Sequence, residues 1–333
     1  MTKARNLSLL STVEVGATAD QTKADIDALG IAADITAGDT AARAGRKNFI
    51  INGGFDVWQR GTTGAQANGG FVADRWKGNN YTTGTFTFSQ RTDATGQTFR
   101  TYGRLAQSSA GSNALSQGIM QYIEGLHLVG KTVTVSFKVR GNAALSGCKV
   151  RGIIAQQTFN LTTDWVKHSF TGTAIQNGSN TTLVLDWGLE NTTWHVDIAE
   201  VQVEVGSVAT DFEHRSYGEE LALCQRYYYQ VGGSAMEYLC QGDFYTDTQF
   251  NPSIIFPVTM RTAPSFTQVS GANYFIVYRA SNAVYKDDDW TFWKSSPNVA
   301  SIYGPMDASS TQGHSGRCLA ADGNAKLMFS AEL

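Results

Sequence analysis

Proline is missing from this 333-residue chain before Pro252, and charged residues make up only 17% of it. The basic residues are scattered and the formal net charge is −3, which argues against a nucleic-acid-binding protein, because phosphate binding needs clustered Lys and Arg. No apolar run approaches the roughly 18–20 residues of a membrane-spanning helix. The N-terminal apolar stretch is too short and too polar for a signal peptide, so we expect the chain to fold in a cytoplasm.

Cysteine motifs and catalytic signatures are also missing. Cys148, Cys224, Cys240 and Cys318 form no C-x-x-C motif, which argues against zinc ribbons and thioredoxin-like folds, and we expect reduced, partly buried thiols. The sequence has no G-x-S-x-G, H-E-x-x-H, P-loop or dinucleotide-binding glycine signature, and its five histidines are dispersed. These absences predict that the protein is not an enzyme. One enzymatic alternative stays open, a polysaccharide depolymerase in which a carboxylate of Asp287–Asp289 pairs with a distant glutamate.

Threonine, serine, glycine and asparagine are abundant, a composition typical of an all-β protein with many turns. The first 47 residues differ, since they are rich in alanine and contain no aromatic residue. A helix is predicted over Ala19–Leu29, with Thr18 as its N-cap and Gly30 at its end. Its apolar side chains are mostly alanine and bury little area. We therefore expect residues 1–47 to become ordered only against copies of themselves or another protein, as an attachment and oligomerisation segment.

Residues 48–215 show the two-residue alternation of half-buried strands. In Lys131–Arg140, four apolar side chains share one face, those of Val133, Val135, Phe137 and Val139. Three further segments alternate in the same way: Thr85–Ser89, Trp165–Phe170 and Thr181–Trp187. Several short strands at this spacing predict a jelly-roll or β-sandwich domain.

The segment Val196–Val205 changes phase in its middle. Val196 and Ile198 share one face, and the alternation resumes at Val201. Such a slip within one strand predicts a β-bulge at Ala199–Glu200.

A linking helix is predicted over residues 216–230. Ser216 and Glu219 have the spacing of a capping box, in which the serine side chain accepts a hydrogen bond from the first turn. An apolar stripe follows, made of Tyr217, Leu221, Cys224 and Tyr228.

Glu213, His214 and Arg215 come directly before this helix. Because they are consecutive, an extended segment cannot point all three into one pocket. We expect them to pair across the joint and to fix the angle between two β domains. The alternative is a ligand-binding or acid–base site.

Residues 231–333 hold all five prolines, so we expect their loops and strand edges to differ from those of the first domain, because proline is excluded from central strands. Three segments still have the pattern of strands: Ser253–Met260, Tyr274–Tyr278 and Lys326–Ala331. The fold class predicted for the whole chain is mainly β. It comprises a helical N-terminal segment, a jelly-roll domain, a linking helix, and a smaller C-terminal β domain.

Several segments resemble the tail-fibre or receptor-binding proteins of tailed bacteriophages. Within the first domain these are Asn48–Gly61 (NFIINGGFDVWQRG), Ala73–Trp76 (ADRW), Val196–Thr210 and Phe212–Tyr228. The similarity extends to Ala24–Asp34 (ADIDALGIAAD), Met260–Pro264 (MRTAP) and Leu327–Leu333 (LMFSAEL). One departure is Asp211, where the pattern usually has proline.

This resemblance implies a protein of the virion tail that forms a homotrimer. It implies a jelly roll like that of carbohydrate-binding modules, an N-terminal segment held by a tail adaptor, nozzle or baseplate protein, and binding to a bacterial surface glycan or protein. We expect a non-catalytic glycan-binding protein, with residues 231–333 as its receptor-binding tip. The alternatives are a structural tail adaptor or fibre base without receptor contact, and the depolymerase. Neither nucleic acid nor membrane insertion is expected.

No cofactor is expected except a structural calcium ion. In sandwich carbohydrate modules such an ion often bridges the first and last strands, and the matching residues here are Asp56 and Asp197. Calcium needs several oxygen ligands, and these two carboxylates would supply part of the set. A local hydrogen bond of Asp56 within a turn is the alternative.

Glycan-binding residues are expected where aromatic rings adjoin acids, because sugars stack on rings and present hydroxyls to carboxylates. Lys286–Lys294 (KDDDWTFWK) contains Asp287, Asp288, Asp289, Trp290 and Trp293. Its tryptophans would lie on opposite faces of a strand, one in the core and the other exposed. Trp187 and Trp194 form a second candidate platform, with packing in the core as the alternative.

Overall fold

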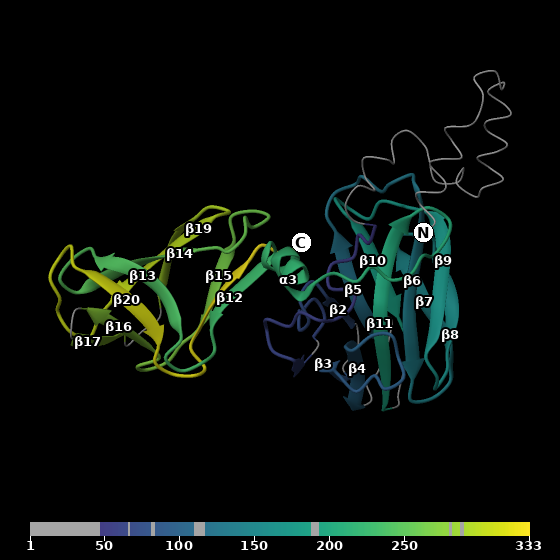
Figure 1. Cartoon of the computed structure of the whole chain (residues 1–333), viewed down its shortest axis with the longest axis horizontal. Coiled ribbons are helices and arrows are strands. Elements are labelled where there is room, and N and C mark those ends of the chain that lie inside the picture. The colour runs from purple at the N-terminus through teal and green to yellow at the C-terminus, as the bar shows by residue number, and fades with distance from the viewer. Residues whose placement is uncertain are drawn as a thin grey trace, which may run out of the picture.

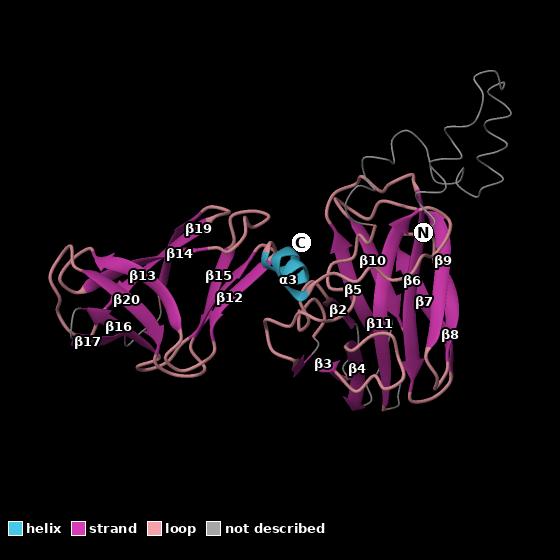
Figure 2. Cartoon of the chain, viewed as in Figure 1, coloured by secondary structure: helices cyan, strands magenta, loops and turns pink. Residues whose placement is uncertain are grey.

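The structure is a computed structural model that describes residues 47–65, 67–80, 84–109, 117–187, 193–279, 282–286 and 290–333. The helix expected over Ala19–Leu29 lies outside the described residues, as do Asp287–Asp289. The described chain forms two β lobes with helix α3 between them (Figure 1). Strands dominate both lobes (Figure 2), so the predicted mainly β fold class is confirmed.

The first lobe is a sandwich of two antiparallel sheets. One sheet has six strands in the order β1 (Thr63–Ala65), β3 (Thr85–Arg91), β4 (Tyr102–Ser109), β11 (Trp194–Val205), β6 (Thr132–Gly141) and β9 (Val166–Thr173). The other has five strands in the order β2 (Lys77–Asn80), β5 (Gln117–Ile123), β10 (Thr181–Asp186), β7 (Leu145–Gly152) and β8 (Gln157–Leu161). The strands predicted for residues 48–215 all fall within these sheets.

The apolar faces of the two sheets meet in one core. The four alternating residues of β6 are buried there as predicted: Val133, Val135, Phe137 and Val139. Each such side chain contributes about 1.5–3 kcal/mol when it is fully removed from water. Trp76 and Phe55 stack in the same core, with ring centroids 5.2 Å apart. The alternation therefore determines which face of each strand turns inward.

The predicted bulge in β11 is present. The pairing of β11 with β6 shifts register between Ala199 and Gln202, and Glu200 has φ = +53°. A bulge adds an unpaired residue and bends the strand. Before the bulge β11 also pairs with β4, and after it β11 continues along β6 and forms backbone hydrogen bonds with Phe49 and Gly53.

The second lobe packs a three-stranded sheet against a seven-stranded sheet. The smaller sheet has the order β12 (Tyr228–Gly232), β21 (Lys326–Ser330) and β15 (Ser265–Val269). The larger has the order β17 (Asn282–Lys286), β16 (Phe275–Arg279), β20 (Ser315–Ala320), β13 (Tyr238–Phe244), β14 (Gln249–Ile255), β19 (Val299–Pro305) and β18 (Thr291–Ser295). One apolar core lies between them and includes Phe329 of β21 and Phe250 of β14.

Pro252 corrects the expectation that proline stays out of central strands. It lies in β14, between β13 and β19, and opposite Gly242 of β13. The pairing of β14 with β19 is interrupted at Asn251 and Pro252 and resumes at Ser253. Proline has no N–H to donate, so the strand tolerates it where the ladder to one neighbour is already broken.

Helix α3 (Tyr217–Gln225) is shorter than the predicted 216–230, because Tyr228 already belongs to β12. The N-cap prediction is correct, since Ser216 Oγ accepts a hydrogen bond from the Glu219 N–H at 3.3 Å. The predicted apolar stripe is correct only in part, because Cys224 and Tyr228 are buried and Leu221 is half-buried, but its first member is not. Tyr217 is exposed, and the buried residues of α3 are Cys224 and the charged Glu220. No helix among the described residues is long and apolar enough to cross a membrane.

Candidate functional site

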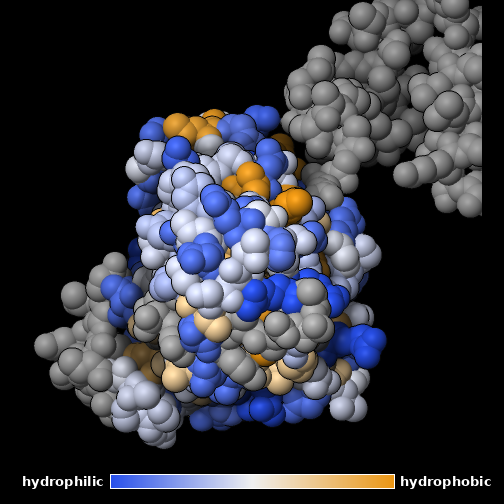
Figure 3. Space-filling view, turned by 90° about the vertical axis from the view of Figure 1, so that its left-hand side faces the viewer, coloured by the Kyte–Doolittle hydropathy of each residue, from blue (hydrophilic) through white to orange (hydrophobic). Residues whose placement is uncertain are grey.

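The two tryptophans predicted at the tip of the second lobe have different surroundings. Trp290 is 3% exposed and packs in the core against Phe250 and Phe275, whereas Trp293 in β18 is 56% exposed. This is the expected split into one core and one surface residue. Figure 3 looks onto the end of the second lobe away from α3, where the surface is mostly hydrophilic with small, separate hydrophobic areas. The structure thus leaves Trp293 as the surface ring of this pair.

Trp187 and Trp194 do not form a surface platform. Both rings are buried in the core of the first lobe, where Trp187 meets Phe159 edge to face and Trp194 lies beside Phe86. The Trp194 indole N–H donates a hydrogen bond to Gln107 Oε1 at 2.5 Å. The core-packing alternative is therefore the correct one for both residues.

The two carboxylates considered for calcium have separate partners. Asp56 accepts a hydrogen bond from the Thr101 hydroxyl. Asp197 is 0% exposed and forms ion pairs with Arg104 at 2.6 Å and Arg140 at 2.9 Å. Two guanidinium groups repel a divalent cation, so the surroundings of Asp197 do not suit calcium. Among the described residues, no group of three or more His, Cys, Asp or Glu side chains has metal-binding geometry.

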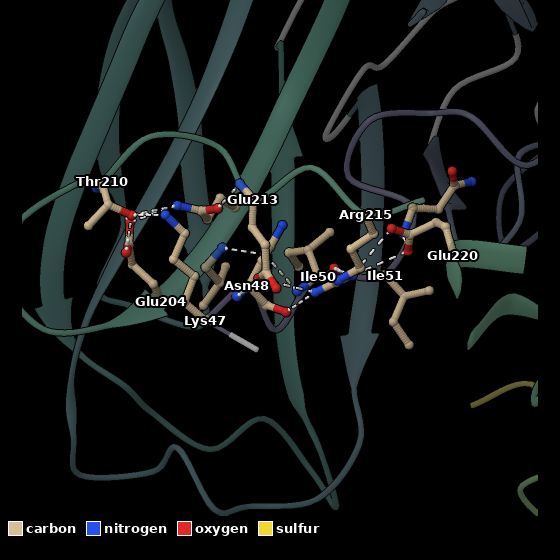
Figure 4. A network of polar contacts seen from close by, with 12 residues as sticks. Lys47, Asn48, Ile50, Ile51, Glu204, Thr210, Glu213, Arg215 and Glu220 are labelled. Carbon is tan, nitrogen blue, oxygen red and sulfur yellow. Dashed lines mark hydrogen bonds and ion pairs between the residues drawn. The ribbon is translucent and has the colours of Figure 1, made fainter. Parts of the chain in front are cut away.

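Glu213 and Arg215 hold the start of the first lobe to the segment before α3 (Figure 4). Glu213 Oε2 accepts the Asn48 N–H at 2.6 Å, and Arg215 donates to the Asn48 and Ile50 carbonyls, the latter at 3.0 Å. Arg215 also pairs with Glu220 of α3 at 3.3 Å. Both ends of the first lobe are thereby tied together.

A second group of bonds extends this network along the same two segments (Figure 4). Lys47 donates to the Thr210 hydroxyl at 2.7 Å, and Glu204 accepts the Thr210 N–H at 2.9 Å. Near α3, Glu220 accepts the Asn52 N–H at 2.6 Å. Burial raises the pKa of Glu220, and the hydrogen bond from Asn52 and the charge of Arg215 oppose that shift.

The predicted role of Glu213, His214 and Arg215 needs correction. Their polar contacts among the described residues are with the first lobe and α3, and the His214 ring contacts Phe212. They do not pair across to the second lobe.

Two arginines of the first lobe make the contact across the joint instead. Arg75 pairs with Glu332, and its guanidinium lies 3.6 Å from the centroid of the Tyr227 ring. Arg60 pairs with the same Glu332 at 3.1 Å, and its guanidinium lies 3.5 Å from the centroid of the Tyr228 ring. Guanidinium groups stack well on aromatic faces while binding carboxylates in plane. The two lobes are thus joined by a buried ionic and aromatic contact.

Further polar groups complete this joint. Asp74 pairs with Arg60 at 3.2 Å and accepts the Gln59 N–H at 2.6 Å, yet burial raises the pKa of its carboxyl to about 6. Glu124 accepts hydrogen bonds from Arg226 at 3.0 Å and the Tyr227 hydroxyl at 2.7 Å. Burial raises the pKa of Glu124, but these two bonds and the charges of Arg226 and Arg261 together hold the pKa below its usual value.

Arg75 also has an unusual backbone. Its φ is +69°, a left-handed conformation that few residues other than glycine adopt. Surrounding structure must hold such a conformation in place, and the bonds of the Arg75 side chain to Glu332 and to the Tyr122 carbonyl do so. Arg60 and Arg75 occur in two of the segments that resemble phage proteins. That resemblance is the feature of the sequence that could have pointed to these two arginines.

A further cluster lies on the outer face of the six-stranded sheet. Ser89 pairs with Arg104, Arg104 with Asp197, and Asp197 with Arg140 on four adjacent strands. Their side chains therefore form one row across the sheet, and Trp165 lies at its end, directly before β9. We call Tyr102, Arg104, Arg140, Trp165 and Asp197 the outer-face cluster.

Asp197 organises the outer-face cluster. Arg104 donates to it through Nε at 2.6 Å and Nη2 at 2.9 Å, and Arg140 donates through Nε at 2.9 Å. Arg140 also donates to the Tyr102 hydroxyl at 3.3 Å, and its guanidinium lies 5.0 Å from the centroid of the Trp165 ring. Bonds between fixed partners hold both arginines in one orientation.

Trp165 is half-buried, and two aromatic residues support its ring. It meets Phe99 and Tyr102 edge to face, at centroid distances of 4.9 and 5.3 Å. Burial raises the pKa of Tyr102, as does its hydrogen bond to Asp93, so its hydroxyl stays protonated. The cluster thus combines a fixed aromatic ring with charged hydrogen-bond donors on a partly exposed surface.

Sequence reasoning did not find the outer-face cluster. It placed Asp197 in a calcium site and Trp165 in a strand, and it did not single out Arg104 or Arg140. The alternation did put Asp197 on the face opposite the core residues Val196 and Ile198. What was missing is the register of β4, β11 and β6, which brings residues 57 and 93 positions apart into contact.

No family model and no curated protein matches the chain. Solved structures with some similarity include a CBM4 structure, 22% identical over 46% of this chain and 97% of its own, with a TM-score of 0.33. The CBM22-1 xylan-binding domain of Paenibacillus barcinonensis Xyn10C is 14% identical over 44% of this chain and 94% of its own, with a TM-score of 0.29. The enzymatically active domain of bacteriophage CBA120 tailspike protein 4 is 11% identical over 47% of this chain and 21% of its own, with a TM-score of 0.33. Similarity at this level carries no conclusion about what this chain binds.

Proposed function

We propose that this protein is a receptor-binding or tail-fibre protein of a tailed bacteriophage, which attaches the virion to a bacterial surface glycan without cleaving it. The phage assignment is supported by the sequence resemblance, whose segments Asn48–Gly61 and Ala73–Trp76 supply Arg60 and Arg75 to the joint between the lobes. A joint built from buried ion pairs suits a fibre that must transmit force from virion to cell.

The observation that carries glycan binding is the outer-face cluster. Glycans need a ring on which their C–H faces can lie, together with fixed hydrogen-bonding groups for their hydroxyls. Trp165 supplies a half-buried ring, while the partly exposed Arg104 and Arg140 supply oriented polar groups beside it.

In this proposal the protein is a homotrimer in the virion tail. Residues 1–47 contact a tail adaptor, nozzle or baseplate protein, and Lys47 begins the network that ties this segment to the first lobe. Light scattering of the full chain at micromolar concentration should give the mass of a trimer. A stable monomer would contradict this part of the proposal.

Adsorption of the full-length protein to a panel of bacterial strains tests the function. We expect fluorescently labelled protein to bind at least one strain, and Trp165→Ala to weaken that binding at least tenfold, because the ring carries the stacking contact. Trp293→Ala is the matched control, since it removes an exposed tryptophan from the other lobe. Loss of binding with Trp293→Ala alone would move the receptor site to the second lobe.

The same material separates the alternatives. Release of reducing ends from the polysaccharide of an adsorbing strain would identify a depolymerase and contradict the non-catalytic assignment. Binding to no strain, together with co-purification of another tail protein, would identify a structural adaptor. Electron microscopy of the virion, with the chain located at the tail tip or at the fibre base, decides between receptor contact and an adaptor role.

A further inference from the structure

We infer that the outer-face cluster recognises an acidic sugar, one that carries a carboxylate or a phosphate group, through the guanidinium groups of Arg104 and Arg140 beside the Trp165 ring. The inference rests on the proposed function, because it names the class of glycan that the proposed site takes.

The charges of the outer-face cluster do not balance within the chain. Asp197 is one carboxylate, and it is shared by two guanidinium groups. The neighbouring charges are paired one to one, Arg91 with Asp93 and Lys138 with Glu200. One positive charge therefore remains on this row, in a chain whose formal net charge is −3. A neutral sugar requires hydrogen bonds but no such excess of positive charge.

The geometry also leaves donors for an anion. Arg104 uses Nε and Nη2 on Asp197, and Arg140 uses Nε on Asp197 and Nη2 on the Tyr102 hydroxyl. Within the described residues, the Nη1 group of each arginine has no hydrogen-bond partner. Guanidinium groups bind carboxylates and phosphates through short, charge-assisted bonds, and an arginine that is already oriented loses little entropy on binding.

An arginine on the outer face of the other sheet gives the contrast. Arg151 in β7 forms an ion pair with the buried Asp186 at 3.3 Å. The two arginine sites resemble each other in exposure: the side chain of Arg151 is 35% exposed and that of Arg140 is 31% exposed. At the outer-face cluster, two guanidinium groups share Asp197, and one of them lies beside the Trp165 ring.

The test uses the full-length protein and surface polysaccharide extracted from a strain that adsorbs it. One portion stays native, in a second the carboxyl groups are reduced to alcohols, and a third is dephosphorylated with cold hydrofluoric acid. Binding is measured by isothermal titration calorimetry. We expect one of the two treatments to weaken binding about tenfold or more, and the effective treatment identifies the acidic group as carboxylate or phosphate.

Three variants connect this effect to the cluster. Arg140→Gln should weaken binding to the native polysaccharide about tenfold and should bind the neutralised polysaccharide as the unaltered protein does. Arg140→Lys keeps the charge and should recover part of the affinity, while the matched Arg151→Gln should leave the affinity unchanged. Thermal melting of each variant checks that it is folded.

The outcomes separate the two proposals. Adsorption to cells, with equal affinity for native and for both neutralised polysaccharides, would overturn the acidic-sugar inference and leave the proposed function standing. Equal losses with Arg140→Gln and Arg151→Gln would also overturn it. Adsorption to no strain would overturn the proposed function and this inference with it.

Discussion

The joint between the lobes and the outer-face cluster are built from the same kinds of residue, yet they differ in how deeply their arginines are buried. At the joint, Arg75 is almost fully buried and meets Glu332, the Tyr122 carbonyl and the Tyr227 ring. In the outer-face cluster, Arg104 and Arg140 are partly exposed and share one carboxylate. The arginines of the joint are largely covered by the chain, although Arg75 Nε has no hydrogen-bond partner among the described residues. Those of the outer-face cluster are partly accessible to solvent.

This difference shows that an arginine–carboxylate pair has no fixed role. A buried pair is costly to break, because removing one partner leaves the other as an uncompensated charge in a low dielectric. In the outer-face cluster the carboxylate is fully buried but the arginines are partly exposed, so water can solvate the guanidinium groups when the pair is broken and the pair contributes less to stability. The joint is therefore suited to holding two sandwiches together, and the outer face to binding something from outside.

Arg75→Ala should lower the stability of the protein more than any substitution in the outer-face cluster. It leaves Glu332 with one of its two arginines and removes the cation from the Tyr227 ring, so we expect the free energy of unfolding to fall by about 3–5 kcal/mol. Urea unfolding of the full-length protein measures the change. A loss below about 1 kcal/mol would mean that Arg75 does not form its contacts with Glu332 and the Tyr227 ring in solution.

Asp74 should make the stability of the joint depend on pH. Burial raises the pKa of its carboxyl from the ordinary value of 3.8 to about 6. The folded state then holds this proton more tightly than the unfolded state, so stability should decrease as the pH rises from about 4 to about 6, by about 2–3 kcal/mol.

Asp74→Asn provides the control for this pH dependence, because the amide does not titrate. The difference in unfolding free energy between the unaltered protein and this variant should change across that window and stay constant above about pH 7. A difference that is flat from pH 4 to pH 7 would contradict the raised pKa.

Asp197→Asn is the corresponding substitution in the outer-face cluster. The two guanidinium groups lose their shared anion but stay in contact with water, so we expect a loss of about 1–3 kcal/mol, smaller than for Arg75→Ala. Because Asp197 orients both arginines, adsorption to cells should also weaken. A stability loss as large as that of Arg75→Ala would indicate that the ion pairs of the outer-face cluster stabilise the fold as strongly as those of the joint do.

Arg91→Ala should have the smallest effect. Arg91 and Asp93 form a solvent-exposed pair at 3.4 Å, and such pairs contribute at most about 1 kcal/mol. Thermal or urea unfolding should show little change, and the hydrogen bond of Asp93 to Tyr102 should persist. A loss of more than about 2 kcal/mol would show that this pair belongs to the outer-face cluster energetically.

Much of the fold could be predicted because it depends on local pattern. The alternation in β6, the phase slip in β11 and the serine cap of α3 each involve residues a few positions apart. Predictions failed where distant residues decided the outcome. Glu220 is buried in place of Tyr217 because the Asn52 N–H, 168 positions away, donates a hydrogen bond to its carboxylate there.

The candidate sites follow the same division. The sequence showed that Trp290 and Trp293 differ in exposure, since alternation along a strand is local. It could not show that Asp197 lies between two arginines, because that depends on the register of three strands.

The order of residues was enough to predict the mainly β fold class and which face of several strands is buried. It also predicted the bulge in β11 and the residue at which α3 begins. Periodic burial and capping act over a few residues, so their signal is present in the chain order. The ion pairs of Arg60 and Arg75 with Glu332, and those of Arg104 and Arg140 with Asp197, are visible only in the folded chain. These contacts join residues 57 to 272 positions apart, and only strand pairing and the packing of the two lobes bring such residues together.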